Sequence, residues 1–128
     1  MSSYLLDTHT AIWFFDGNSA MSPAADRIIR DRTNRIYVSV VSAWELTIKI
    51  SIGKLRFPGD AAGFMHAAQH NDIIVIPIET AHLTALKELP FIHRDPFDRL
   101  LVATARAEQM TLITADENIA RYDVQHIW

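Results

Sequence analysis

Short hydrophobic runs alternate along the chain with longer stretches in which hydrophobic positions recur every three or four residues. The short runs show little polar alternation, which is typical of strands buried on both faces of a parallel sheet. Four strands are expected, with a candidate fifth at the end of the chain: Tyr4–Leu6, Ile36–Val41, Ile73–Ile76, Thr111–Thr114 and Val124–Trp128. Because strands that alternate with helices form right-handed crossovers, the pattern predicts an α/β fold, a three-layer sandwich around a central parallel sheet.

The segments between these runs have helical periodicity, and capping residues mark their ends. Ser22 and Pro23 are typical of a helix start, and Gly53 is typical of a helix end. The expected helices are one that opens at Ser22-Pro23 and those at Ala43–Ile52, Asp60–His70, Glu79–Leu89 and Phe97–Gln109. Since no repeat, linker or change of composition interrupts the chain, residues 1–128 are expected to form a single domain.

Composition narrows the class of protein. Hydrophobic residues make up 49% and charged residues 21%, which argues against disorder. The absence of cysteine excludes disulfides and thiolate metal ligands, and neither a membrane span nor a signal peptide is expected, so we expect a cytoplasmic protein. The net charge of −3 and the pI near 6.0 argue against passive electrostatic binding of nucleic acid. Any contact with phosphates is therefore expected to use a bound cation.

Four acidic residues far apart in the sequence lie where expected strands end or helices begin. Asp7 and Asp116 follow strands, Glu45 lies in the first turn of the helix after the second strand, and Asp98 opens the last long helix. Ligands of open parallel sheets bind beyond the carboxyl ends of the strands. The four carboxyl groups are therefore expected to meet at one edge of the sheet.

Each acid also has a purely structural explanation. Glu45 fits a capping box with the serine three positions earlier, and Asp98 follows a helix start in which Asp95 is the cap. Asp116 could cap a short helical segment, and Asp7 could be an exposed acid at a strand end. The two explanations differ in geometry, because caps need not share one edge of the sheet.

A cluster of carboxylates has a clear chemical use. Two carboxylates about 5 Å apart repel each other by roughly 3 kcal/mol at an effective dielectric constant of 20, so a cluster must protonate or bind a cation. Mg²⁺ and Mn²⁺ prefer oxygen ligands, and such ions activate water and neutralise charge on a phosphodiester. The cluster thus predicts hydrolysis of phosphodiesters by metal-activated water.

Four segments, LLDTH, SAWEL, DPFDRLLVATA and LITAD, occur in this order and resemble the PIN domain, and more narrowly the VapC-type toxins of type II toxin–antitoxin pairs. The resemblance covers essentially the whole chain. It implies a metal-dependent endoribonuclease with a Rossmann-like sheet, in which Asp7, Glu45, Asp98 and Asp116 hold the Mg²⁺ or Mn²⁺. It also implies a homodimer that acts on RNA and a small antitoxin protein that blocks the site with its C-terminal part.

Other residues near the four acids are expected to support the site, cap a helix or contact RNA. The resemblance gives Thr114 a supporting role, and Thr8 neighbours the first acid. Asp95 is interpreted first as a helix cap and second as an auxiliary metal residue. Arg94 and Arg99 could contact RNA phosphates or could be exposed charges that flank a helix start.

The aromatic residues receive a structural role only. Trp13, Phe14, Phe15 and Trp44 are expected in the core or a dimer interface and not as stacking partners of bases.

Other functions fit the sequence less well. A phosphotransferase with Asp7 as nucleophile would resemble haloacid dehalogenases, but His9 breaks their DxDxT pattern. A zinc-protease helix with His66 and His70 would need Glu where Ala67 stands. Two alternatives stay open: a PIN-type RNA-processing nuclease without an antitoxin, and a catalytically silent PIN-like interaction module.

Overall fold

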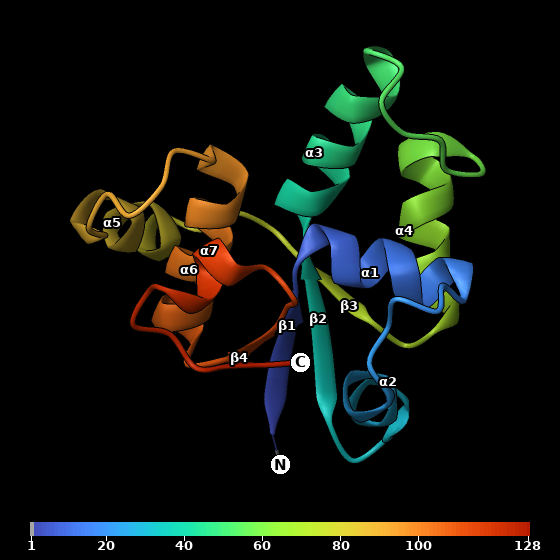
Figure 1. Cartoon of the computed structure of the whole chain (residues 1–128), viewed down its shortest axis with the longest axis horizontal. Helices are drawn as coiled ribbons and strands as arrows, with labels where there is room; N and C mark the ends of the chain where they lie inside the picture. Colours follow the sequence, from blue (N-terminus) through green and yellow to red (C-terminus); the bar gives the residue numbers. More distant parts are fainter. Residues whose placement is uncertain (1) are drawn as a thin grey trace.

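A fully parallel sheet lies at the centre of the molecule, which a computed structural model describes for residues 2–128 (Figure 1). Its strands are β1 (Ser3–Leu6), β2 (Arg35–Ser39), β3 (Ile74–Ile76), β4 (Thr111–Ile113) and β5 (His126–Ile127). They lie in the order β3-β2-β1-β4-β5. The predicted central parallel sheet and its five strands are confirmed.

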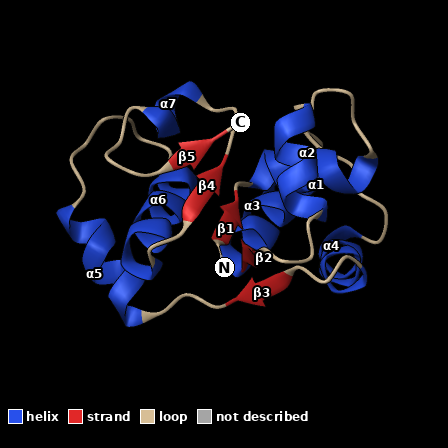
Figure 2. Cartoon of the chain, turned by 90° about the horizontal axis from the view of Figure 1, so that it is seen from below, coloured by secondary structure: helices blue, strands red, loops and turns tan. Residues whose placement is uncertain are grey.

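Helices cover both faces of this sheet (Figure 2). They are α1 (Thr8–Asp16), α2 (Pro23–Arg30), α3 (Val40–Ser51), α4 (Asp60–His70), α5 (Thr80–Glu88), α6 (Pro96–Glu108) and α7 (Glu117–Ala120). The first four lie on one side of the sheet and the last three on the other, which confirms the three-layer sandwich. Within residues 2–128, no helix is long and apolar enough to cross a membrane.

Two separate hydrophobic clusters fill the spaces between the layers. Successive side chains of a strand point to opposite faces, so Leu6 enters the cluster under α1–α4 and Leu5 the cluster under α5–α7. Phe14 and Phe15 pack against the first cluster, as expected. Trp13 and Trp44, by contrast, belong to neither cluster of the described chain, so of the two places expected for them, the core or a dimer interface, the core does not apply.

The boundaries of most predicted elements agree with the structure within two residues. Helix α3 begins three residues earlier than predicted because Ser39 is its cap and accepts a hydrogen bond from the Val41 amide at 3.0 Å. Helix α1 was not among the predicted ranges. Its run of consecutive hydrophobic residues, Ala11–Phe15, hides the helical period.

The order of the strands creates a switch point beside β1. The chain first builds outward from β1 to β2 and β3, then crosses back to place β4 on the other side of β1. Crossover helices therefore leave β1 and β4 toward opposite faces, which opens a crevice beyond their carboxyl ends. Asp7 directly follows β1 and Thr114 directly follows β4, so both lie at this crevice.

Helix α4 packs closely against the turn that precedes it. An added Cβ at Gly63 would lie 1.8 Å from the carbonyl oxygen of Pro58, far inside contact distance. Next to it, Phe64 is fully buried and its ring packs against Phe57. The missing side chain at position 63 lets this turn and the aromatic core approach each other.

We expect Gly63→Ala to lower the free energy of unfolding by about 1–3 kcal/mol, because the added methyl group forces the Pro58 turn away. Helix propensity alone would give the opposite sign, a gain of roughly 1 kcal/mol. Ala62→Gly, at an exposed position of the same helix, calibrates that propensity. Urea denaturation of the three proteins checks the prediction, and a Gly63→Ala protein as stable as wild type would contradict it.

Candidate active site

Asp7 connects the end of β1 to the start of α1. As the N-cap of α1 it accepts a hydrogen bond from the Thr10 amide at 2.8 Å, and the Thr114 hydroxyl donates to its other carboxyl oxygen. Its side chain is buried, and burial raises its pKa although the hydrogen bonds from Thr114 and Thr10 act in the opposite direction. The carboxyl group is thus held in one orientation between the ends of β1 and β4.

Asp116 lies beside Asp7 because Thr114 contacts both residues. The Thr114 hydroxyl accepts a hydrogen bond from the Asp116 amide at 3.0 Å while it donates to Asp7. Asp116 also caps α7, since its carboxylate accepts from the Asn118 amide at 2.8 Å. These contacts place Thr114 between Asp7 and Asp116, and its supporting role at the site stays a prediction.

Glu45 does not form the capping box that its spacing allows. Glu45 lies in the second turn of α3, where the residue is 3% exposed. One carboxyl oxygen accepts from the Thr8 hydroxyl at 2.7 Å, and the other forms an ion pair with Lys49 at 2.8 Å. The burial of Glu45 is therefore offset by polar contacts and serves no capping role.

The sequence left open whether Asp95 and Asp98 act as helix caps or belong to the acid cluster, and the two residues differ in this respect. Asp95 is the N-cap of α6 and accepts from the amides of Phe97 and Asp98, which agrees with its interpretation as a cap. The Asp98 carboxyl group instead lies 3.2 Å from Nε2 of His93. It takes no part in the cap hydrogen bonds of its helix.

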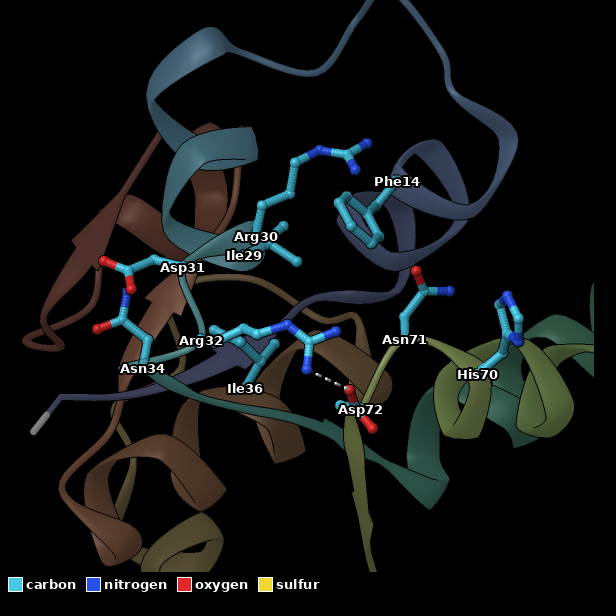
Figure 3. A pocket seen from close by; sticks show the side chains of 10 residues that line it. All are labelled: Phe14, Ile29, Arg30, Asp31, Arg32, Asn34, Ile36, His70, Asn71 and Asp72. Atoms are coloured by element: carbon cyan, nitrogen blue, oxygen red, sulfur yellow. Dashed lines mark ion pairs between the residues drawn. The ribbon is translucent and has the colours of Figure 1, made fainter.

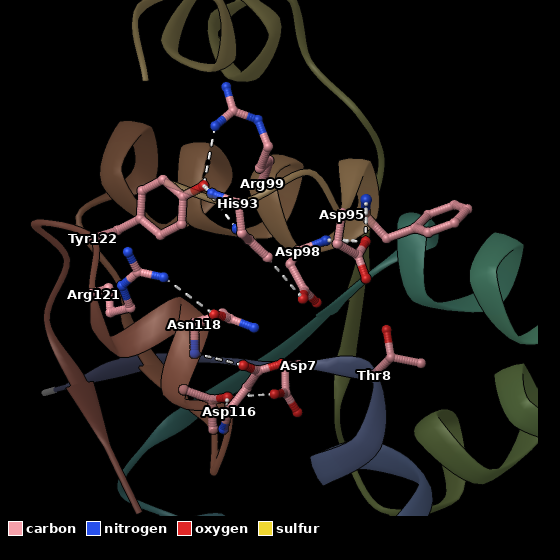
Figure 4. Close-up of polar contacts among 12 residues, drawn as sticks. Asp7, Thr8, His93, Asp95, Asp98, Arg99, Asp116, Asn118, Arg121 and Tyr122 are labelled. Atoms are coloured by element: carbon pink, nitrogen blue, oxygen red, sulfur yellow. Dashed lines mark hydrogen bonds and ion pairs between the residues drawn. The ribbon is translucent and has the colours of Figure 1, made fainter. Parts of the chain in front are cut away.

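Like charges gather around Asp98. Burial raises its pKa to about 8, and the negative charges of four neighbouring acids act in the same direction, in decreasing order Asp95, Asp116, Glu45 and Asp7. Asp98 and these four acids come from four separate places in the chain, because Asp95 and Asp98 share the start of α6, yet all lie within electrostatic reach of one carboxyl group. Figure 4 shows the side chains of Asp7, Asp98 and Asp116 around a common space.

The donor set suits a hard cation. The carboxyl groups at this edge and the hydroxyls of Thr8 and Thr114 offer oxygen, and the repulsion around Asp98 is what a divalent ion would relieve. Within residues 2–128, no three acidic or histidine side chains are close enough together to hold one ion by themselves. Mg²⁺ typically keeps several waters and uses one or two carboxylates, so the residues fit such an ion.

A hydrogen-bonded chain behind Asp98 fixes its orientation. The Tyr122 hydroxyl accepts from the Arg99 guanidinium at 3.0 Å and lies 2.8 Å from Nδ1 of His93 (Figure 4). The Tyr122 hydroxyl also accepts from the His93 backbone amide at 3.3 Å, so its own proton is available to Nδ1, and in the tautomer that accepts this proton Nε2 of His93 donates to Asp98. Sequence reasoning missed Tyr122, because no local pattern connects it with Asp98, which lies 24 positions earlier.

The structure separates the two arginines expected to contact RNA. Arg94 is exposed and free to reach a phosphate. Arg99 is 5% exposed, and its guanidinium donates to the Pro90 carbonyl oxygen at 2.8 Å and lies against the Phe91 ring. This burial does not fit the predicted RNA contact, because the guanidinium is already enclosed by protein.

A second polar hollow lies at the opposite end of the sheet, near the amino ends of β2 and β3 (Figure 3). It has a volume of about 580 Å³, and an exposed ion pair joins Arg32 and Asp72 across it at 3.4 Å. Its charges are mixed, and none of the four clustered acids lines it. The acid cluster is thus separate from this hollow.

A parallel α/β sheet with carboxyl groups gathered at its switch point defines the class of protein, and sequence comparison gives the family. The family model described as PIN domain matches residues 4–125. The chain belongs to the PIN-domain family, as the resemblance implied. The comparison with curated protein sequences gives no match.

Solved structures of similar fold come from several bacteria. VapBC2 from Rickettsia felis, bound to a promoter DNA fragment, matches with a TM-score of 0.72 and 16% identity over 98% of this chain and 97% of that chain. DNA-bound VapBC from Salmonella typhimurium matches with 0.72 and 14% identity over 99% and 98%. FitAcB from Neisseria gonorrhoeae matches with 0.61 and 18% identity over 98% and 96%. At these identities the likeness is one of fold.

We expect the burial of Asp98 and the repulsion around it to make the metal-free protein less stable as the pH rises. A carboxyl group whose pKa is raised on folding binds protons more tightly in the folded state, so the free energy of unfolding falls between about pH 4 and pH 8. Asp98→Asn should flatten this fall and make the protein more stable near pH 8, where each pKa unit corresponds to roughly 1.4 kcal/mol.

Chemical denaturation in chelator at pH 5 and pH 8 measures this effect. Asp26→Asn, which alters an exposed ion pair with Arg30 on α2, is the control and should leave the pH dependence unchanged. If Asp98→Asn and wild type lose stability equally over this range, folding does not raise the pKa of Asp98.

Proposed function

We propose that this protein is a metal-dependent endoribonuclease and acts as the toxin of a toxin–antitoxin pair. The observation that carries the proposal is the convergence of Asp7, Glu45, Asp98 and Asp116 on one edge of the sheet, where burial and the charges of the other acids raise the pKa of Asp98. A charge cluster of this kind costs stability unless a cation offsets it. PIN-domain membership supports the same activity.

These four acids would hold Mg²⁺ or Mn²⁺, one or two of them directly and the others through the waters that such an ion keeps, with Asp95 as an auxiliary residue. A bound ion would supply activation of water and neutralisation of the charge that develops on the phosphodiester. The protein's own groups orient the ligands, because the hydroxyl of Thr114 donates to Asp7 and the hydroxyl of Thr8 donates to Glu45.

Water is the proposed nucleophile. The hydroxyl groups nearest the acids, those of Thr8 and Thr114, direct their protons to carboxylates and are not poised to attack phosphorus. Arg94 is exposed just before the N-cap of α6. We propose that it contacts an RNA phosphate and orients the RNA backbone.

Glu45→Gln and Asp98→Asn should each reduce RNA cleavage at least about 100-fold, because transition-state stabilisation by the ion is worth several kcal/mol. Neither residue is a helix cap, so loss of activity should come without loss of folding. The assay is cleavage of mixed single-stranded RNAs in Mg²⁺, Mn²⁺ or chelator, with mapping of the product ends.

Asp16→Asn, at the exposed C-terminal end of α1, is the matched control and should retain wild-type activity. Full cleavage in excess chelator would refute the metal requirement. A covalent aspartyl intermediate on Asp7 would instead favour the phosphotransferase alternative.

The same assay, together with the neighbouring genes, tests the two alternatives left by the sequence. A catalytically silent interaction module would bind RNA or protein without cleaving RNA under any of these metals. An RNA-processing nuclease would cleave but would have no small inhibitor encoded beside it. The toxin proposal requires both cleavage and such an inhibitor.

A small antitoxin is the proposed protein partner, and a homodimer is the proposed assembly. The VapBC structures of similar fold support such a partner. The acid cluster would attract an Arg or Lys side chain of the partner's C-terminal segment into the place of the cation. The partner would thus block the site by charge as well as by shape.

We therefore expect the small protein encoded beside this gene to co-purify with the chain and to inhibit cleavage, and Mn²⁺ to weaken the inhibition by competition. Removing the partner's C-terminal segment should abolish inhibition even if the remaining contact persists. Titration of cleavage against both partner forms measures this. A partner that binds fully while cleavage continues unchanged would contradict occupation of the site.

A further inference from the structure

A small pocket beside the acid cluster has aromatic walls. It has a volume of about 240 Å³ and is lined by Asp7, His9, Trp13, Ala115 and Asp116; we call it the aromatic pocket. His9 and Trp13 are four positions apart on α1, so their side chains share one face of the helix. Their ring centres lie 5.9 Å apart.

The Trp13 ring is not explained by the hydrophobic core. It lies outside both clusters of the described residues, and its second aromatic neighbour is Trp128, with ring centres 5.8 Å apart. His9 is exposed, and within residues 2–128 its ring forms no hydrogen bond. The rings of His9, Trp13 and Trp128 thus form a row next to Asp7 and Asp116 without a core-packing role for its central member.

We propose that the aromatic pocket binds one unpaired RNA base, that of a nucleotide next to the cleaved phosphodiester. This inference rests on the proposed nuclease function and adds the part of the substrate that the site recognises. Because the pocket and the acid cluster share Asp7 and Asp116, a nucleotide whose phosphate lies at the acids can place its base against Trp13. The substrate would then have to be single-stranded at this position.

The chemistry of the lining favours a base over other parts of the RNA. Every base has a flat π face that stacks on aromatic side chains. The carboxyl groups of Asp7 and Asp116 repel a phosphate that has no accompanying metal ion, so the uncharged base is the part of the nucleotide that enters. The volume of about 240 Å³ suits a single heterocycle and is too small for a folded partner segment.

A binding experiment tests the pocket without requiring cleavage. In a Trp44→Phe background, the remaining fluorescence comes from Trp13 and Trp128, the two tryptophans of the aromatic row. Adenosine, guanosine, cytidine and uridine are titrated in chelator. We expect saturable quenching by at least one nucleoside, and an affinity at least about 5-fold lower after His9→Ala.

A cleavage experiment then tests the role in the substrate complex. Trp13→Leu should lower kcat/KM for single-stranded RNA roughly 5- to 100-fold and weaken the base preference beside the cut, whereas Trp13→Phe should retain both. His66→Ala, which removes an exposed ring on α4, is the control for His9→Ala and should change neither. His9→Ala lies at an exposed position, so it keeps the test valid if Trp13→Leu fails to fold.

The outcomes separate the two proposals. Nucleoside binding that depends on His9, without RNA cleavage by wild type, would support the pocket and overturn the nuclease. Normal cleavage, with no nucleoside quenching and an unchanged base preference after His9→Ala and Trp13→Leu, would overturn the pocket. Loss of antitoxin affinity in these variants without any effect on nucleosides or RNA would also overturn it, since the pocket would then receive a protein side chain.

Discussion

The parallel ladder between β1 and β4 positions everything else at the site. It places Leu6 opposite Ile113, so the next residues along each strand, Asp7 and Thr114, leave the sheet side by side. The hydroxyl of Thr114 then donates to Asp7 and accepts from the Asp116 amide, which joins two segments more than 100 residues apart in the chain. A shift of this register by one residue would separate these groups and send Leu5 and Leu6 to the wrong cores.

Polar contacts of different kinds stabilise the carboxyl groups that meet there. Asp7 receives an amide and a hydroxyl, Glu45 receives a hydroxyl and the Lys49 ammonium, and Asp98 receives the imidazole of His93. Among the described contacts of these three residues, only those of Asp98 include neither a fully charged cation nor a backbone amide. Asp98 is also the residue whose pKa the negative charges of neighbouring acids raise. The position with the least local compensation is also the one where a cation would gain most.

The sequence predicted those features of the fold and site that depend on local order along the chain. Acids that follow buried parallel strands must lie at the carboxyl edge, so the places of Asp7 and Asp116 could be derived from neighbouring residues alone. The choice between Ser39 and Ser42 as cap of α3 could not, because both are good caps and the length of β2 decides which is used. The burial of Arg99 depends on Tyr122 and on the loop that holds Pro90, which are tertiary neighbours without a sequence signal.

Two of the four clustered acids have a second duty, and this bears on how the family could diverge. Asp7 and Asp116 are N-caps of α1 and α7, whereas Glu45 and Asp98 cap nothing. A gene copy released from selection for catalysis would still lose about 1 kcal/mol of stability for each cap it gave up. Selection for folding alone would therefore retain Asp7 and Asp116 while Glu45 and Asp98 drifted. Among the descendants of such a gene, the presence of both Glu45 and Asp98 would therefore indicate retained catalysis more reliably than the presence of Asp7 and Asp116.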